Sequence, residues 1–108
     1  MNDIQFENDL NALIEILPPK IKRQNKPEDL TDAIEIVLDI GRTPEVRLGN
    51  GKVVYLPLET TTSEDLEYIT KNVNEFTSDN RSGIPGTLHR ISAIRNRQGK
   101  IIGLTCRI

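Results

Sequence analysis

The stretch that decides the fold is residues 87–108, TLHRISAIRNRQGKIIGLTCRI, which has the pattern of a β-hairpin. Two runs rich in Ile, Leu and Thr flank the polar segment 96–100, where Gly99 can supply the positive φ that a tight reversal needs. If the reversal is centred on Gln98 and Gly99, residues at equal distances before and after this centre face each other across the hairpin. The remaining segments are then a platform that holds this hairpin.

This register divides the hairpin into an apolar and a mostly polar face. The apolar face holds Ile91, Ala93, Ile102, Leu104, Cys106 and Ile108, with His89 and Arg95 at its edges. The polar face holds Arg90, Ser92, Ile94, Asn96, Ile101, Gly103, Thr105 and Arg107. Because a slip of one residue would move one strand's apolar set to the polar face, the pattern favours this register.

The same register places Arg90 directly opposite Arg107. Like charges that face each other across a strand pair cost about 0.2–1 kcal/mol unless an anion or an acidic side chain lies between them. The pair therefore has the pattern of an anion site. Two alternatives stay open from the hairpin alone, because both arginines could extend into solvent or meet an acidic side chain elsewhere in the fold.

Length and composition limit the fold. With 108 residues the chain makes one domain, and 4% aromatic residues without Trp require an aliphatic core.

The charge distribution points to the same end of the chain as the arginine pair. Residues 1–80 contain all 16 acidic side chains but only 8 of the 14 basic ones. The basic side chains of the remaining segment are Arg81, Arg90, Arg95, Arg97, Lys100 and Arg107. An anionic partner would be steered towards this carboxy-terminal segment.

Catalytic and metal-binding patterns are missing from the sequence. The single cysteine, Cys106, forms no internal disulfide, and its apolar-face position predicts a buried thiol. One His and one Cys are too few for a zinc site, and no GxxxxGK[ST] loop or nucleophile–His–acid spacing is present. Without an apolar run of about 18 residues or a leader peptide, we expect a soluble intracellular protein. We expect no enzyme activity, cofactor or metal in this chain.

The amino-terminal third begins with a helical pattern. Apolar residues recur every three or four positions from 4 to 17, which predicts a helix that ends at Pro18 and Pro19. A short basic segment, 20–26, follows, and it fits a second helical turn as well as a solvated connector. We treat residues 1–29 as an amino-terminal helical segment and residues 30–108 as an α+β domain.

The middle of the chain has three predicted strands. Residues 33–40 fit both a strand alternation and a helix stripe, and the β-branched content together with Gly41 favours a strand. Residues 45–48 and 52–57 alternate around Asn50-Gly51, the strongest short-range signal for a hairpin.

A second helix and a loop lead to the final hairpin. Thr61, Thr62 and Ser63 are candidate N-caps, with two acids in the first turn. The buried stripe of this helix would consist of Leu66, Ile69, Val73 and Phe76. Residues 77–86 contain two Gly and one Pro among small polar residues, which predicts a loop. The predicted fold is α+β: helix, three-stranded antiparallel segment, helix and hairpin, forming one mixed or antiparallel sheet with helices packed on it.

Two stretches also carry a family likeness over roughly residues 30–108. The run DNRSGIPGTLHRISAIRNRQGKIIGLTCRI, preceded by IEIVLDIGRTPEVRL, resembles the segment upstream of the ATP-binding loop in P-loop ATPases of cyanobacteria and algal plastids. That group is labelled single-stranded nucleic-acid-binding, after an arginine-histidine motif module, and is similar to stage III sporulation protein AA. The likeness implies a non-catalytic regulatory or assembly domain, in the cytoplasm or plastid stroma. Its partners would be a carboxy-terminal ATPase domain of the same chain, which uses ATP and Mg, and further copies in a ring.

A more distant likeness concerns the arginine pair. The order of elements is similar to that in amino-terminal domains of secretion and pilus-retraction ATPases, whose last-hairpin arginines reach nucleotide phosphates. This likeness implies that Arg90 and Arg107 contact the phosphates of a nucleotide held by the following domain.

The alternative function is binding of a nucleic-acid backbone by the hairpin tip. Its cationic residues are Arg95, Arg97 and Lys100, but no aromatic side chain is interleaved with them to stack a base. Arg81 and His89 lack the Arg-x-x-x-His spacing of the module behind the nucleic-acid label, so that label does not transfer to this chain. A third possibility is that the tip is only a solvated turn.

Overall fold

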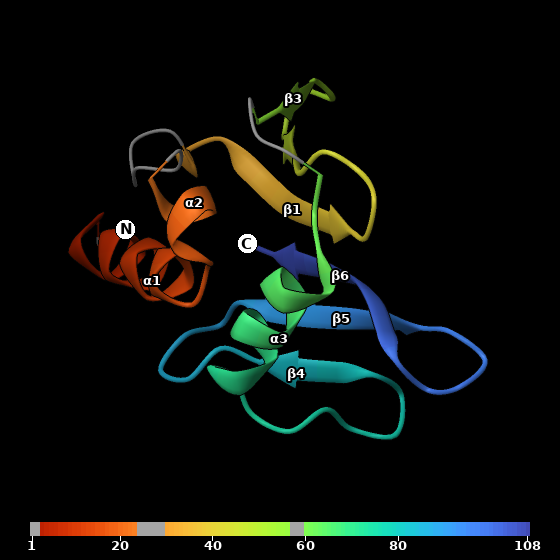
Figure 1. Ribbon diagram of the computed structural model, residues 1–108. Helices are drawn as coiled ribbons and strands as arrows, with labels where there is room; N and C mark the ends of the chain where they lie inside the picture. The colour runs from red at the N-terminus through yellow and green to blue at the C-terminus, as the bar shows by residue number, and fades with distance from the viewer. Residues whose placement is uncertain (1–2, 24–29, 57–59) are drawn as a thin grey trace.

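The computed structural model describes residues 3–23, 30–56 and 60–108, with the backbone alone for residues 3–8. The helices are α1 (Asp3–Glu15), α2 (Pro19–Lys22) and α3 (Ser63–Lys71). The strands are β1 (Ala33–Asp39), β2 (Glu45–Leu48), β3 (Val53–Tyr55), β4 (Arg81–Gly83), β5 (Arg90–Arg95) and β6 (Ile101–Arg107). They form one sheet in the order β3-β2-β1-β6-β5-β4, and all five strand pairs are antiparallel (Figure 1). The α+β prediction is confirmed.

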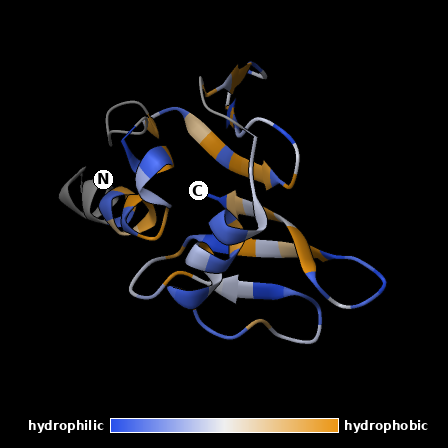
Figure 2. Cartoon of the chain, in the orientation of Figure 1, coloured by the Kyte–Doolittle hydropathy of each residue, from blue (hydrophilic) through white to orange (hydrophobic). Residues whose placement is uncertain are grey.

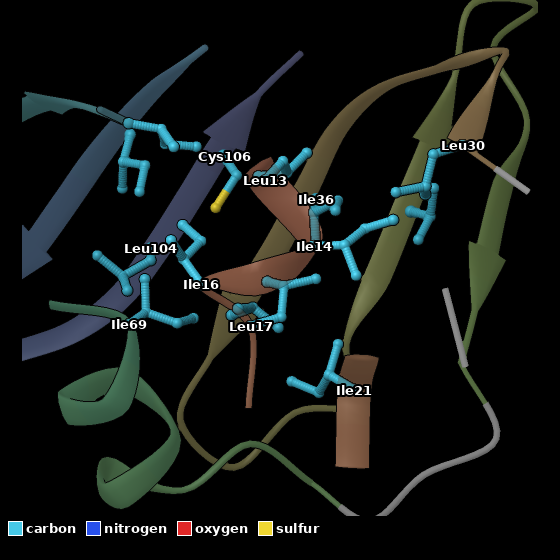
Figure 3. Packing of buried hydrophobic residues seen from close by; sticks show 14 of the residues in the cluster. Leu13, Ile14, Ile16, Leu17, Ile21, Leu30, Ile36, Ile69, Leu104 and Cys106 are labelled. Carbon is cyan, nitrogen blue, oxygen red and sulfur yellow. The ribbon is translucent and has the colours of Figure 1, made fainter. Parts of the chain in front are cut away.

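The helices bury one face of this sheet. Figure 3 shows Leu13 of α1 and Leu17 of the turn after it directed towards the same cluster as Ile36 of β1 and Leu104 of β6. Ile69 of α3 belongs to this cluster, and it is fully buried, as the other four are. The opposite face of the sheet carries no helix of the described chain, and most of its side chains are polar or half-exposed. We call these the inner and the outer face.

The amino-terminal region follows its sequence signals closely. The backbone N–H groups of Ile16 and Leu17 bond to carbonyls three residues earlier, so the chain tightens after α1 and before Pro18. The short helix α2 realises one of the two alternatives for the basic segment, and its Ile21 is fully buried. Residues of α1 and α2 share one hydrophobic cluster with the strands, although the boundary at residue 29 stays a prediction, because residues 24–29 lie outside the described chain.

Strand β1 confirms the choice of strand over helix, with one irregularity. Ile36 and Leu38 are fully buried on the inner face, as the alternation predicts. Ile34 is an extra residue between the pairs Ala33–Leu48 and Glu35–Arg47, so it leaves the alternation and is exposed.

The β5–β6 register agrees with the predicted one along most of the hairpin. Ile91 pairs with Cys106 and Ala93 with Leu104, all on the inner face. Near the tip the register shifts, because Ile94 pairs with Gly103 whereas Arg95 pairs with Ile101.

Ile102 is therefore the extra residue of a β-bulge. The bulge reverses the predicted faces of Ile101 and Ile102. The prediction that Ile102 lies on the apolar face and Ile101 on the polar face was wrong. Ile102 is exposed, while Ile101 packs against the hydrophobic core. A bulge of this kind depends on local backbone geometry that the apolar pattern does not record.

Helix α3 begins at the predicted cap. Thr62 is the N-cap: its hydroxyl accepts a hydrogen bond from the N–H of Asp65, and the Asp65 carboxylate accepts one from the N–H of Thr62. Lys20 of α2 lies 2.9 Å from the same carboxylate, so the capping box also links two helices. The N-cap prediction is thereby narrowed to one residue.

Helix α3 ends earlier than predicted. Its C-cap, Asn72, donates a side-chain hydrogen bond to the carbonyl of Tyr68. That bond occupies a carbonyl that a continued helix would need, which favours termination. Val73 and Phe76 still pack against the core, but from an irregular segment rather than from the helix stripe.

The segment 77–86 was predicted to be a loop, and this prediction was wrong in one part. Arg81–Gly83 forms strand β4, which pairs with β5. The strand is short and polar, and its stability comes from tertiary contacts, since buried Ser82 donates a hydrogen bond to the carbonyl of Asn74. Asn80 takes a positive φ of 61° just before the strand, which turns the chain into the sheet.

The turn between β2 and β3 contains the predicted Asn50-Gly51. Leu48 donates its backbone N–H to the carbonyl of Lys52, and Gly51 adopts the positive φ. Residue 57, the predicted end of the second strand, lies outside the described chain. Within the described residues, no helix has the length and apolar character needed to cross a membrane.

The Thr62 cap generates a stability prediction. We expect Thr62→Ala to lower the free energy of unfolding by about 1 kcal/mol, because an orphan N–H in the first turn loses its acceptor. Urea denaturation followed by circular dichroism measures this difference. The control is Thr60→Ala, whose exposed side chain lies outside the helix. Equal stability of the two variants would contradict the capping role.

Cys106 generates a reactivity prediction. The thiol is fully buried, as predicted, and burial raises its pKa to about 12 because the thiolate loses its hydration. We expect the native protein to resist thiol reagents at pH 8, and the labelling rate to follow the rate of unfolding. Reaction of the folded protein within seconds would show that the thiol is accessible.

Candidate functional site

The candidate site is a hollow of about 520 Å³ on the outer face, above β4, β5 and β6. We call it the arginine hollow. The residues that line it are Thr77, Asp79, Arg81, Arg90, Ser92 and Arg107. Neighbouring strands bring these residues together although they come from three separate segments of the chain (Figure 1).

The two arginines predicted for phosphate contact lie side by side. Arg90 of β5 is the ladder partner of Arg107 of β6, and both side chains line the same hollow. Within the described chain neither guanidinium forms a salt bridge within 4.0 Å or a hydrogen bond. The acidic side chain nearest in the ladder is Glu35, opposite Arg107 on the β1 side, but its carboxylate lies 3.5 Å from Arg47. The alternative in which an acidic side chain of the described residues pairs with Arg90 or Arg107 is therefore not observed.

Small side chains make room between the arginines. In the ladder Arg90 has Gly83 as its neighbour on β4, while Ser92 lies between Arg81 and Thr105. Side chains of this size leave space beside the arginines, and Ser92 lines the same hollow. A hydroxyl and several guanidinium forks are suitable donors to the oxygens of a phosphate.

Arg81 is a third arginine of the site that the sequence reasoning did not assign to it. The prediction missed it because β4 was expected to be a loop, so no register placed Arg81 beside Ser92. Ser92 could have been found from sequence, since it lies two residues from Arg90 and a strand has a period of two. For Thr77 and Asp79 no such periodic signal exists.

Asp79 is the one carboxylate among the residues that line the hollow. It lies 4.0 Å from the Nε atom of Arg81 and accepts a hydrogen bond from the hydroxyl of Thr77. The Thr77 hydrogen bond, with a smaller contribution from Arg81, holds the pKa of Asp79 below its usual value. At neutral pH Asp79 is therefore ionised, and among the described salt bridges its partner is Arg81 rather than Arg90 or Arg107.

The residues of the alternative nucleic-acid site are all exposed, but Arg95 is held by two side-chain hydrogen bonds. Arg95 donates from Nε to the side-chain oxygen of Asn80 at 2.7 Å and from a terminal nitrogen to the carbonyl of Gly99 at 2.8 Å. Arg95 and Lys100 line a smaller hollow against α3, whereas Arg97 is exposed at the hydrophilic tip (Figure 2). The structure thus uses Arg95 to brace the hairpin.

The remaining chemistry-bearing side chains are separate from the arginine hollow. His89 is buried, and its Nε2 has no hydrogen-bond partner in the described chain. Among the described residues no three His, Cys, Asp or Glu side chains lie together as a metal site would require.

The fold and the site together define the class: an α+β domain with a one-sided sheet whose outer face carries an arginine-lined hollow. No family model matches the chain. It is similar to the uncharacterized protein ycf45 of Porphyra purpurea, with 47% identity over 102 residues, and to the Arabidopsis thaliana protein SEEDLING PLASTID DEVELOPMENT 1, with 46% identity over 101 residues. The uncharacterized protein ycf45 of Cyanidium caldarium is 41% identical over 105 residues.

These similarities cover nearly the whole chain but only part of each relative. The aligned regions are 93–94% of this chain, and they amount to 18%, 15% and 30% of the three relatives, respectively. The chain thus spans less than a third of the length of the curated relatives it matches.

The comparisons correct the family resemblance drawn from the sequence. That resemblance pointed to P-loop ATPases labelled single-stranded nucleic-acid-binding and to a sporulation protein, but the relatives are named ycf45 and SEEDLING PLASTID DEVELOPMENT 1. None of these names refers to an ATPase or to nucleic acid, so the assignment was wrong. The expected link to plastids agrees with the name of the Arabidopsis relative.

Arg95 generates a prediction that separates bracing from binding. We expect Arg95→Ala to lower the free energy of unfolding by about 1 kcal/mol, because two side-chain hydrogen bonds to the hairpin and to Asn80 are lost. Arg97→Ala is the matched control, since Arg97 is exposed and makes no hydrogen bond within the described residues. Urea titrations of both variants give the comparison, and an unchanged Arg95→Ala midpoint would remove the bracing role.

Proposed function

We propose that this domain is a non-catalytic phosphate-binding unit that works as part of a longer protein. Arg90 and Arg107 contact the phosphates of a nucleotide that is held mainly by another part of that protein. The single observation that carries the proposal is the opposed arginine pair, which shares one hollow and has no carboxylate partner in the described chain.

The energetics support a ligand at this position. Two opposed guanidinium groups repel each other, and the repulsion of about 0.2–1 kcal/mol disappears when a phosphate lies between them. A phosphate accepts bidentate hydrogen bonds from each arginine, and such charge-assisted bonds are about twice as strong as neutral ones. Binding therefore converts an unfavourable contact of the free domain into a favourable one.

The proposal is narrower than the function expected from sequence. The names of the relatives lend no support to a ring assembly, an ATPase partner or Mg, so the proposal does not depend on them. The name of the Arabidopsis relative refers to plastid development, and we propose a plastid or its cyanobacterial equivalent as the place of action.

The test is a titration of the 108-residue chain with inorganic pyrophosphate, followed by NMR shifts of the β5 and β6 amides. We expect a dissociation constant on the order of 1 mM for the wild type, and at least about tenfold weaker binding for Arg90→Ala and for Arg107→Ala. Neither substitution should lower the melting temperature, because each removes a like-charge contact.

The control variant is Arg97→Ala, which removes one exposed arginine of the hairpin tip. It should bind pyrophosphate as the wild type does. Equal affinities of all four proteins would contradict the proposal. A single-stranded oligonucleotide titrated at several salt concentrations tests the alternative, since backbone binding by Arg97 and Lys100 would weaken steeply with salt.

A further inference from the structure

Strand β3 is an unprotected edge of the sheet. It stands at the end of the strand order, so one side of its backbone has no neighbouring strand in the described chain. Its three residues, Val53, Val54 and Tyr55, are 41%, 46% and 63% exposed. Figure 2 shows this hydrophobic strand at the periphery of the molecule. An exposed apolar edge strand is a template for pairing with another strand.

The direction of the free backbone groups follows from the β2–β3 ladder. Leu48 donates to the carbonyl of Lys52, and Leu56 donates to the carbonyl of Pro44. The backbone N–H and C=O groups of residues 52 and 56 therefore point towards β2. Because these groups alternate along a strand, those of Val54 point towards β2 as well. The N–H and C=O groups of Val53 and Tyr55 point the other way, towards the open edge.

The opposite edge of the sheet is protected. The free side of β4 is covered by the preceding segment, where Thr77 donates its N–H to the carbonyl of Arg81 and Ser82 bonds to the carbonyl of Asn74. Strand β3 has no comparable cover within residues 3–23, 30–56 and 60–108, and it carries neither a charge nor a proline. The β4 edge is thus protected from pairing with another strand, whereas the β3 edge is open to it.

We propose that β3 pairs with β3 of a second copy of this chain, antiparallel and centred on Val54. In this register Val53 of each copy faces Tyr55 of the other, and these two pairs supply four backbone hydrogen bonds from the groups that point to the open edge. The central residue, Val54, faces its own counterpart. One two-fold operation therefore covers all three exposed apolar side chains.

Side-chain chemistry supports a second copy as the occupant. On the inner face Val54 lies next to buried Val46 of β2, so the Val54–Val54 contact extends the core across the interface. On the outer face each valine meets an aromatic ring, a favourable cross-strand pair. Lys52 falls opposite Leu56, so no like charges are opposed, and the pattern is complementary to itself.

The interface is small, because only three residues of each copy form the strand pair. Its area falls below that of standard protein interfaces, so we expect a dissociation constant between about 0.1 and 1 mM. The pairing is independent of phosphate binding, since the arginine hollow lies above β4, β5 and β6.

The test is disulfide trapping, which detects a weak dimer. In the proposed register the two Val54 Cα atoms form a non-hydrogen-bonded pair about 4.5 Å apart, a separation that a disulfide accepts. We expect Val54→Cys to give a covalent dimer under mild oxidation at 0.2 mM protein, about tenfold faster than Val53→Cys, whose Cα atoms would be roughly 8 Å apart. Wild type is the blank, because its one thiol, Cys106, is buried.

A second variant tests the association without a cross-link. Val54→Lys places two ammonium groups against each other, so sedimentation at about 1 mM protein should show a monomer where the wild type dimerises partly. The matched control is Ile34→Lys, at a β1 position that is 48% exposed; it should dimerise as the wild type does. Two outcomes would overturn the proposal: a monomeric wild type at this concentration, or equal cross-linking rates at positions 53 and 54.

Discussion

The antiparallel ladder between β5 and β6 is the constraint on which the rest of the structure depends. Its inner pairs, Ile91–Cys106 and Ala93–Leu104, fill the centre of the core, and burying each large aliphatic side chain contributes about 1.5–3 kcal/mol. The same register forces Arg90 against Arg107 on the outer face at a cost of about 0.2–1 kcal/mol. Hydrophobic burial outweighs this repulsion, so the arginine pair is a consequence of the core.

The two faces of the sheet have different roles, since one forms the core and the other is open to further contacts. The inner face is covered by α1, α2 and α3, and the capping box of Asp65 together with Lys20 holds two of these helices to each other. The outer face is left for other contacts, with the arginine hollow above β4–β6 and the open strand β3 at the other end of the sheet. A site on regular strands is held more rigidly than one on loops, because ladder hydrogen bonds fix the spacing of its side chains.

Irregularities of the backbone decide what the outer face exposes. The extra residues Ile34 and Ile102 are both exposed, because a bulge moves a side chain out of the alternation of its strand. Asn80 at positive φ turns a polar segment into β4 and brings Arg81 to the hollow. The side chain of Asn80 is in turn held by Arg95, so the tip of the last hairpin and the edge strand support each other.

The sequence by itself determined the fold class, the order of the main elements and the opposed arginine pair. These features follow from periodic apolar patterns and turn residues, which are local, and a strand register needs only the position of its turn. Only the tertiary structure decided the bulge at Ile102, the early end of α3, strand β4, and therefore the place of Arg81 and Asp79 in the site. Strand β4 depends on contacts between segments distant in sequence, whereas the bulge and the end of α3 depend on local backbone and side-chain geometry. Neither kind of contact leaves a period in the apolar pattern of the chain.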